Sequence, residues 1–384
     1  MSTAQNGSKP PIAIIETIGS HGGMHYYTDN QAHALVNQGH RVTLYSLPAS
    51  TDAGARYRKV DTFKAIYGPD PKAIRGLRLI RDLTTAIVSA RRWGAKVCIF
   101  HLFKMDIFEL YAARLCRMLG MKSMAVVHDV ARLDQPNDRP QLARIAGFTD
   151  LLITHNGFSE TALLQALAGA PANVSVIPSG NYIAQFPNPP SKAQARDRLK
   201  LPHDKQVILF FGNPRREKGL HVLLEAMVAH RDNERLLVLV AGKMKPDEEA
   251  EYRGFARANG LDARVRFDIG HVDDADVPSY YRAPDIVALP YLRIYESAVA
   301  LMAMSLERPV LASDLPPMRD VIGEDVRGLL FAASDAQALS ARIGDLMADP
   351  ARLADLAANA AHYAANDRHW DVTGRMLSAA AQSL

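Results

Sequence analysis

The stretch QVILFFGNPRREKGLHVLLEA, residues 206–226, decides the fold of this chain. Its first part is a continuous apolar run that ends at Gly212, which is typical of a buried parallel strand. A short basic loop then leads into apolar residues at helical spacing. Backbone N–H groups at a helix start, together with Arg215 and Lys218, can form a receptor for a diphosphate. Taken alone, the stretch is also compatible with an ordinary strand-to-helix loop whose charges are solvated.

The same alternation recurs along the chain. Apolar strands are predicted at residues 12–15, 41–46, 97–100, 123–127, 151–154 and 174–177, and again at 207–211, 236–240, 265–267, 286–289 and 310–312. Helices are predicted at 26–38, 105–119, 219–229 and 297–306. This pattern predicts an α/β fold of two doubly wound, Rossmann-like domains with parallel sheets and right-handed crossovers.

The length of 384 residues favours two domains. The segment QFPNPPSK (185–192) is rich in proline and interrupts regular structure, so 1–184 is predicted as the first domain, 185–205 as a linker and 206–365 as the second domain. A last helix over 366–384, anchored by Trp370 and Met376, is expected to pack back on the first domain. Because ligands bind beyond the carboxyl ends of parallel strands, the site is expected in the cleft between the domains.

Composition points to an ordinary globular enzyme, with 48% apolar and 22% charged residues. The two cysteines, Cys98 and Cys116, cannot form a disulfide framework and favour a reducing compartment. No apolar run approaches the roughly 20 residues of a membrane span, and the polar first ten residues lack the core of a signal peptide. These features together predict a cytoplasmic location.

The positive charge of the chain is regional. Residues 56–96 contain eleven Lys or Arg against three Asp, a net +8 within a chain of net +4. This predicts one polyanionic contact surface and not a general affinity for nucleic acid. Within it, residues 72–93 could form an amphipathic helix with Leu77 and Leu83 on its apolar face. Two interpretations stay open: peripheral contact with an anionic membrane, or a domain helix with a solvated basic side.

A second strand-to-helix stretch, LPYLRIYESA (289–298), is followed by RPVLASD (308–314). The helix that starts near Ser297 and Ala298, with Glu296 beside it, would point the positive end of its dipole at the same anion. Two such elements in one domain favour a diphosphate ligand more than either element does alone.

With these motifs the chain resembles the GT-B glycosyltransferases, and within them glycosyltransferase family 4, over nearly its whole length. The motifs are the Gly22-Gly23 loop, Gly39-His40, Val127-His128-Asp129, VIPSG (176–180) with Phe186, residues 212–225, Asp285, Leu289-Pro-Tyr291 and the segment from Pro309 to Asp314. Each motif is weak to moderate alone, but their order and spacing are specific.

The resemblance implies a glycosyltransferase that moves a hexose-like unit from a nucleoside diphosphate sugar to a hydroxyl of a lipid-linked or polysaccharide-repeat saccharide. It implies retention of configuration, no metal and no cofactor besides the donor. Donor diphosphate contacts are expected at Gly22, Gly23, Arg215, Lys218, Glu296, Ser297 and Ala298. Nucleoside contacts are expected at Gly212, Gly270, His271 and Met302.

In the first domain the resemblance places His128 near the donor sugar, with Asp129 and His21 as further catalytic candidates. If the enzyme inverts, each of these three residues is a candidate general base. His25 flanks the glycine loop, and His101 ends the strand next to that of His128. For the lone histidines and the glycine turn, a purely structural role is the alternative.

The chain departs from the family pattern at the donor ribose. Members carry two glutamates eight residues apart, and a count back from Pro309 puts the second at Met302 and the first at Ile294. Glu296 could replace the first if the loop is two residues shorter. The family arginine after the strand-end glycine is Asn213 here, and Arg215 can take its place. These departures put the ribose contact in doubt.

The pattern Asp273-Asp-Ala-Asp276 could hold a metal ion, but capping of a helix over 277–282 is the preferred interpretation. Two rival functions remain. One is a non-catalytic partner subunit of the same fold, suggested by Met302. The other is a nucleotide-sugar epimerase or a phosphorylase, the latter requiring a pyridoxal phosphate lysine that the sequence does not distinguish.

Overall fold

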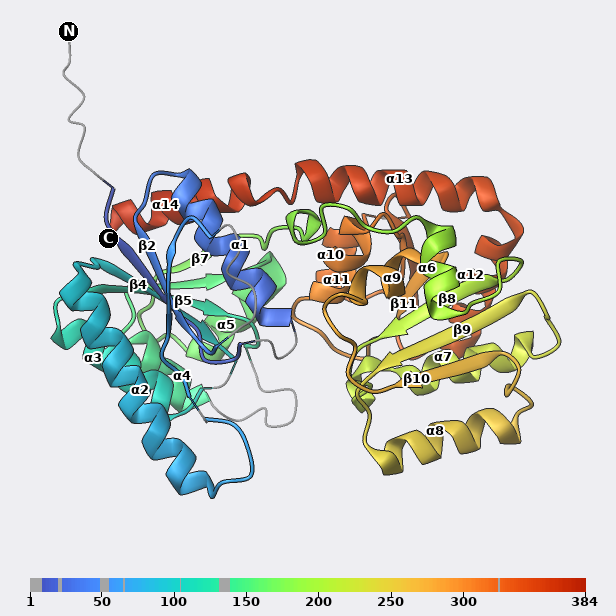
Figure 1. Cartoon of the computed structure of the whole chain (residues 1–384), viewed down its shortest axis with the longest axis horizontal. Helices are drawn as coiled ribbons and strands as arrows, with labels where there is room; N and C mark the ends of the chain where they lie inside the picture. The colour runs from blue at the N-terminus through green and yellow to red at the C-terminus, as the bar shows by residue number, and fades with distance from the viewer. Residues whose placement is uncertain are drawn as a thin grey trace, which may run out of the picture. The chain divides into compact units, whose positions relative to one another are not determined.

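The computed structural model describes residues 9–19, 23–48, 55–64, 66–103, 105–130, 139–323 and 325–384. They fall into two compact units. The first runs to Gly180 and also contains His369–Leu384, and the second is Asn181–Arg368. Each unit is an α/β domain built on one parallel sheet (Figure 1).

The first unit contains, in chain order, β1 (Ile12–Ile15), α1 (Met24–Asn37), β2 (Val42–Ser46), β3 (Arg58–Asp61), α2 (Lys72–Trp93), β4 (Val97–Leu102), α3 (Ile107–Met118), β5 (Lys122–Val127), α4 (Arg139–Ala146), β6 (Leu151–Thr154), α5 (Gly157–Leu167), β7 (Val174–Val176) and the last helix α14 (Trp370–Ser383).

Its sheet has the order β3-β2-β1-β4-β5-β6-β7, with every pair parallel. The first six positions follow the doubly wound order, which reverses between β1 and β4. The helices α2 and α3 lie side by side, and α1 lies beside α14 (Figure 1). All the side chains of β1, β2, β4 and β6 are buried, as expected for strands covered on both faces.

The second unit contains η2 (Ile183–Gln185), α6 (Lys192–Leu199), β8 (Gln206–Phe211), η3 (Arg216–Lys218), α7 (Leu220–Met227), η4 (Val228–His230), β9 (Leu236–Gly242), α8 (Pro246–Ala258), β10 (Val265–Ile269), α9 (Val277–Arg282), β11 (Ile286–Leu289), α10 (Ala298–Ser305), β12 (Val310–Ser313), α11 (Pro316–Ile322), β13 (Gly328–Phe331), α12 (Ala336–Ala348) and α13 (Pro350–Asn366).

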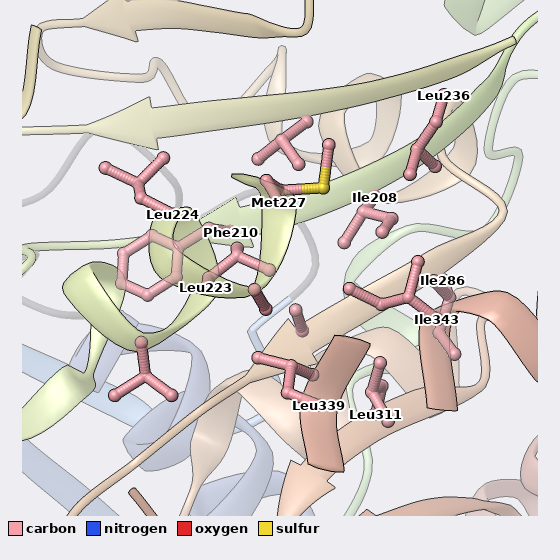
Figure 2. Packing of buried hydrophobic residues seen from close by; sticks show 14 of the residues in the cluster. Ile208, Phe210, Leu223, Leu224, Met227, Leu236, Ile286, Leu311, Leu339 and Ile343 are labelled. Carbon is pink, nitrogen blue, oxygen red and sulfur yellow. The ribbon is translucent and has the colours of Figure 1, made fainter. Parts of the chain in front are cut away.

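Its parallel sheet has the order β10-β9-β8-β11-β12-β13, the doubly wound order again, with the reversal between β8 and β11. Figure 2 shows the core of this unit, where Leu223 and Met227 of α7 pack near Ile208 of β8. Leu339 and Ile343 of α12 fill the same cluster. The predicted two-domain, Rossmann-like α/β fold is confirmed.

The predicted linker over 185–205 is corrected, because these residues belong to the second unit. Its prolines end before Ser191, which begins α6 with a capping box that includes Gln194. Arg196 of α6 then donates a 2.9 Å hydrogen bond to the Asp285 carboxylate. The division between the units therefore lies after Gly180 and not after residue 184.

The helical C-terminus is divided between the units. Instead of one helix over 366–384, α13 ends at Asn366 and α14 begins at Trp370. The break separates α13, in the second unit, from α14, which packs against α1 in the first. His40, which follows α1, also contacts α14, since its Nε2 lies 2.8 Å from Oγ of Ser378.

The basic segment 72–93 forms the helix α2 with the predicted bounds. Its second half packs in the core through Leu83, Ala86 and Ile87, so the interpretation as a domain helix holds there. Its first half leaves Ile74 and Leu77 exposed, with 69% of Leu77 accessible.

Candidate functional site

The two predicted diphosphate loops of the second unit touch each other. At the end of the β8–α7 loop, Gly219 has φ 69°, and a Cβ there would come within 1.7 Å of the carbonyl oxygen of Pro290. The N–H of Leu292 donates a 2.8 Å hydrogen bond to the carbonyl of Glu217. A glycine is therefore required where the loop after β8 meets the loop after β11.

Lys218, Tyr291 and Ser297 form a chain across these two loops. Nζ of Lys218 lies 3.4 Å from the Tyr291 hydroxyl and 4.9 Å from the centre of its ring. The same hydroxyl lies 3.4 Å from Oγ of Ser297. Tyr291 is buried, and so it fixes the direction of the lysine. The structure thus brings together two predicted diphosphate residues and adds Tyr291, which had been named only as part of a motif.

The helix α10 begins at this chain. Ser297 is its N-cap, and its side chain accepts a 3.2 Å hydrogen bond from the N–H of Ala300. Ala298, the first helical residue, is exposed, as is Arg215. An exposed helix start connected to a lysine is an arrangement that can bind an anion. Glu296 adjoins Tyr182, whose pKa is raised by burial and then by this carboxylate.

The predicted nucleoside residues are only partly brought together. Gly212 follows β8 and Gly270 follows β10, on either side of β9. Between them lies Gly242 at the end of β9, which was not among the predicted site residues. A Cβ on Gly242 would come within 2.5 Å of the Gly212 carbonyl oxygen, and its φ is 130°. The sequence signal for it was a glycine ending an apolar strand, as at Gly212.

His271 and Met302 lie in different environments. His271 is exposed, with its Nε2 3.8 Å from a carboxylate oxygen of Asp273. Met302 is 8% exposed on α10, so its side chain is buried and contributes no polar contact. Asp276 holds the N-cap position of α9 but makes no capping hydrogen bond. Its carboxylate pairs with Arg198 at 2.5 Å, which corrects the predicted cap.

In the first unit, His21 and Gly22 lie outside the described residues. Gly23 is described and is the N-cap of α1, with φ 76°. The chain before this loop is held by Glu16, whose carboxylate accepts hydrogen bonds of 3.0 and 2.9 Å from the N–H of Gly19. The Tyr67 hydroxyl donates to the carbonyl of Thr17. Glu16, a buried acid at the end of β1, was not predicted.

Three histidines lie at the carboxyl ends of three neighbouring strands. His101 is in β4, His128 follows β5 and His155 follows β6. Nδ1 of His101 lies 3.0 Å from Nε2 of His128. The ring of Tyr27 packs edge-on at 5.4 and 5.5 Å from those of His101 and His128. Asp129, the third catalytic candidate, is partly buried beside His128.

Burial keeps two members of this histidine cluster (His101, His128 and His155) neutral, namely His101 and His128. Desolvation, followed by repulsion from His155, lowers the pKa of His101 to about 3. Desolvation also lowers the pKa of His128 well below its usual value, with His101 and His155 as further causes. A neutral imidazole can accept or donate a hydrogen bond to a substrate hydroxyl.

His155 and Tyr27 were missed at the sequence level. His155 directly follows an apolar strand, as His128 does, so the same signal could have found it. Tyr27 and Gln31 are spaced four residues apart, which puts them on one face of α1. That face is buried against the histidine cluster, and Tyr27 also packs edge-on against Trp370 at 5.2 Å.

A cavity of about 40 Å³ lies beside His101. Ile15, Phe100 and Phe108 contribute its apolar wall, and Thr17 and Glu109 its polar wall. Burial, followed by the contact with Asp106, raises the pKa of Glu109, so this carboxyl group is neutral. The cavity is large enough for about three water molecules.

Fold and site together define a class of protein: a two-domain enzyme of the GT-B type in which two strand-to-helix loops of the second domain meet. Residues 191–363 match the family described as "Glycosyl transferases group 1", and residues 21–181 match "Glycosyltransferase Family 4". The chain therefore belongs to the group 1 glycosyltransferases, with a first domain of the family 4 type.

Curated relatives share the family. The D-inositol 3-phosphate glycosyltransferase of Xylanimonas cellulosilytica is 32% identical over 60% of this chain and 57% of its own length. Its namesake from Thermobispora bispora is 28% identical over 67% of this chain and 64% of its own length. These two matches span less than two thirds of the relatives. D-inositol 3-phosphate glycosyltransferase 1 of Catenulispora acidiphila matches at 26% identity over 98% and 97% of the two chains.

Solved structures share the fold. Sucrose-phosphate synthase from Thermosynechococcus elongatus superposes with a TM-score of 0.78 at 21% identity, covering 98% of this chain and 99% of that one. HepE of Anabaena in complex with UDP gives a TM-score of 0.76 at 18% identity, covering 97% and 100%. Across the described residues, no helix combines the length and apolar character needed to cross a membrane.

Proposed function

We propose that this glycosyltransferase uses a nucleoside diphosphate sugar as its donor. The observation that carries the proposal is the chain Lys218–Tyr291–Ser297 at the start of α10. Lys218, the exposed Arg215 and the N-terminus of α10 supply positive charge. This charge stabilises the negative charge that develops on the diphosphate as its bond to the sugar breaks. Fixed charges of this kind are usually the largest electrostatic contribution to catalysis. Relatives of the same fold bind UDP, as the HepE complex states.

The proposed reaction retains the configuration of the sugar and needs no metal. The bond between the anomeric carbon and the leaving diphosphate breaks, and a bond to the acceptor oxygen forms on the same face. The acceptor proton passes to the leaving diphosphate. His128, neutral at the carboxyl end of β5, contacts a substrate hydroxyl and is not the base. Nuclear magnetic resonance of the product's anomeric configuration tests this, and inversion would contradict it.

The proposed acceptor is a lipid-linked or polysaccharide-repeat saccharide, reached at an anionic membrane surface. The support is a set of exposed apolar side chains on α2 and α3, two helices that lie side by side. Leu77 is 69% exposed, and Ile107 and Met118 of α3 are 66% and 80% exposed. Exposed apolar side chains among basic ones suit an interfacial contact. The names of the relatives supply the alternative acceptor, inositol 3-phosphate.

The deciding experiment is a nucleotide-release screen. Purified protein is given UDP-, GDP- and ADP-sugars, each alone, with a membrane lipid extract, or with inositol 3-phosphate. We expect one nucleotide to be released in an acceptor-dependent way. Lys218→Ala should lower the rate by about 10²–10³-fold, the usual loss when one such donor is removed. The control is Lys200→Asn, which removes an exposed lysine at the end of α6. Lys200 has a φ of 54°, which asparagine tolerates, so this variant should keep the fold and leave the rate unchanged.

The same screen tests the rival function of a partner subunit. A subunit without catalysis would bind a nucleoside diphosphate but release none from any donor, with a folded chain. Release that survives Lys218→Ala would contradict the proposed role of the two loops. Nucleotide release with inositol 3-phosphate but not with the lipid extract would show that the acceptor is a phosphorylated polyol and not a lipid-linked saccharide.

A further inference from the structure

A hydrogen-bonded chain runs through the first unit from Gln31 to His128. Oε1 of Gln31 lies 3.0 Å from Nε2 of His101, and Nδ1 of His101 lies 3.0 Å from Nε2 of His128. Gln31 is fully buried and His101 is 8% exposed. His128 is the least buried member of the chain, so its second nitrogen, Nδ1, is the one left for a substrate. We refer to these three residues as the relay.

The order of donors along the relay follows from elementary rules. A neutral imidazole has one N–H and one lone pair, and a carboxamide oxygen only accepts. The Nε2 of His101 therefore carries the hydrogen that faces Gln31. The Nδ1 of His101 must then accept, and the Nε2 of His128 must donate to it. This leaves a lone pair on Nδ1 of His128.

We propose that Gln31 and His101 are positioning residues that hold His128 in its Nε2–H tautomer, so that Nδ1 of His128 accepts a hydrogen bond from a substrate hydroxyl. The proposal rests on the contact of His128 with the substrate proposed above. The proposal specifies the direction of that hydrogen bond: Nδ1 of His128 accepts, so the site favours a substrate hydroxyl that donates. A sugar with a methoxy group or a fluorine at that position would be bound poorly, since neither can donate.

Three further observations support the relay. Burial lowers the pKa of His101 and of His128, so both rings are neutral, as the order of donors requires. The ring of His128 stacks on Phe103 at 4.3 Å with an angle of 3° between the planes, which opposes its rotation. The amide nitrogen of Gln31 is buried with no hydrogen-bond partner among the described residues. A leucine would avoid that unpaired donor, so the oxygen is the useful part of Gln31.

His155 is fixed separately and does not compete for His128. Its Nδ1 lies 2.8 Å from the carbonyl oxygen of Ile177, which only accepts, so Nδ1 carries the hydrogen. Its Nε2 then faces the Tyr27 hydroxyl at 3.4 Å as an acceptor. The Nδ1 of His155 is thus held by the backbone just after the neighbouring strand β7, whereas the tautomer of His128 depends on the relay.

The test is the tautomer of His128, measured by long-range ¹H–¹⁵N correlation spectra of the histidine-labelled full chain at neutral pH. In the wild type we expect Nδ1 of His128 in the range of an unprotonated nitrogen and Nε2 in the range of an N–H. Gln31→Leu removes the acceptor that orders His101, and we expect the His128 tautomer to shift toward Nδ1–H. Gln31→Glu places a carboxylate beside His101 and favours its doubly protonated ring, so we expect Nε2 of His128 to become an acceptor and the tautomer to shift toward Nδ1–H as well.

A matched control is His40→Gln, which removes another buried histidine of the same unit, one bonded to Pro10 and Ser378. It should leave the His128 signals unchanged. A protonated Nδ1 in the wild type would overturn the proposal, and so would a His128 spectrum that Gln31→Leu does not alter. Because the spectra need no donor or acceptor, they test the relay even if the proposed function fails.

Turnover supplies the second readout once a donor is known. Gln31→Leu should lower kcat by about tenfold or more, less than the roughly 10²–10⁴-fold loss of a general acid or base because Gln31 acts only through His128, with KM for the donor changed less. Gln31→Glu should lower the rate as well, because it also moves the hydrogen of His128 to Nδ1. Equal losses in both variants, with normal His128 spectra, would overturn the link between the relay and the substrate.

Discussion

Acid should destabilise the first unit through His101. Its pKa is about 3 in the folded chain, against 6.5 for an unperturbed histidine, because burial disfavours the charged ring. Between these two values the unfolded chain binds a proton that the folded chain does not. Stability is therefore complete above the unfolded pKa and falls as the pH drops below it, by about 1.4 kcal/mol per pH unit.

From pH 7.5 to pH 5 this amounts to a loss of about 2 kcal/mol from His101 alone. His101 in the folded chain is still neutral at pH 5. The loss of stability therefore depends on the pKa of His101 in the unfolded chain and hardly on its pKa in the folded chain. His128 has a lowered pKa as well and acts in the same direction. The perturbation is His101→Gln, which abolishes the titration of His101 but keeps a side chain able to hydrogen bond with Gln31.

The assay is urea unfolding followed by tryptophan fluorescence. Both tryptophans, Trp93 and Trp370, lie in the first unit, so the signal reports that unit alone. We expect the difference in unfolding free energy between the wild type and His101→Gln to shrink by about 2 kcal/mol between pH 7.5 and pH 5. An exposed histidine, His271, replaced by Gln, is the control and should show no such change. A difference that stays constant with pH would refute the reasoning.

Three further predictions follow from single contacts. Asp285→Ala leaves the guanidinium of Arg196, which is 4% exposed, without its carboxylate partner. It should lower the free energy of unfolding measured by calorimetry by about 3–5 kcal/mol. A loss below about 1 kcal/mol, which is typical of a surface ion pair, would contradict burial as the cause. Gly219→Ala should weaken nucleoside diphosphate binding by more than about tenfold in titration calorimetry, because its Cβ would meet the neighbouring loop at 1.7 Å. Gly169→Ala, at φ 83° in open space, is its control, and equal binding by both variants would refute the loop contact. Leu77→Gln should reduce co-sedimentation with anionic vesicles without changing the melting temperature, and unchanged co-sedimentation would remove α2 from any membrane contact.

Much of the fold was predictable because parallel strands buried on both faces appear as continuous apolar runs. The strands β1, β6 and β11 were predicted with the observed bounds. The strand β3 (Arg58–Asp61) was not, since it is polar and lies at the edge of its sheet. The helix α6 was missed for a different reason. Its segment follows a run of prolines, and only its capping box and its ion pair with Asp285 show that it is part of the second unit.

The candidate site was predictable where chemistry follows directly from a strand end. Lys218, Ser297 and His128 were each named from such positions, and the structure places the first two in one chain of contacts. The burial of the Met302 side chain was not predictable from the sequence. Only the packing of α10 shows that this side chain is buried, so that no polar atom from this position reaches a ligand.

The sequence by itself determined the class of fold, the family and the strand ends where polar side chains gather, because these depend on local pattern and order along the chain. Tertiary structure alone decided which of these ends meet. The histidines at positions 101, 128 and 155 are far apart in sequence, and they become neighbours because β4, β5 and β6 pair in parallel. Gln31 joins them from α1, and its burial beside His101 sets a proton position that no linear pattern records.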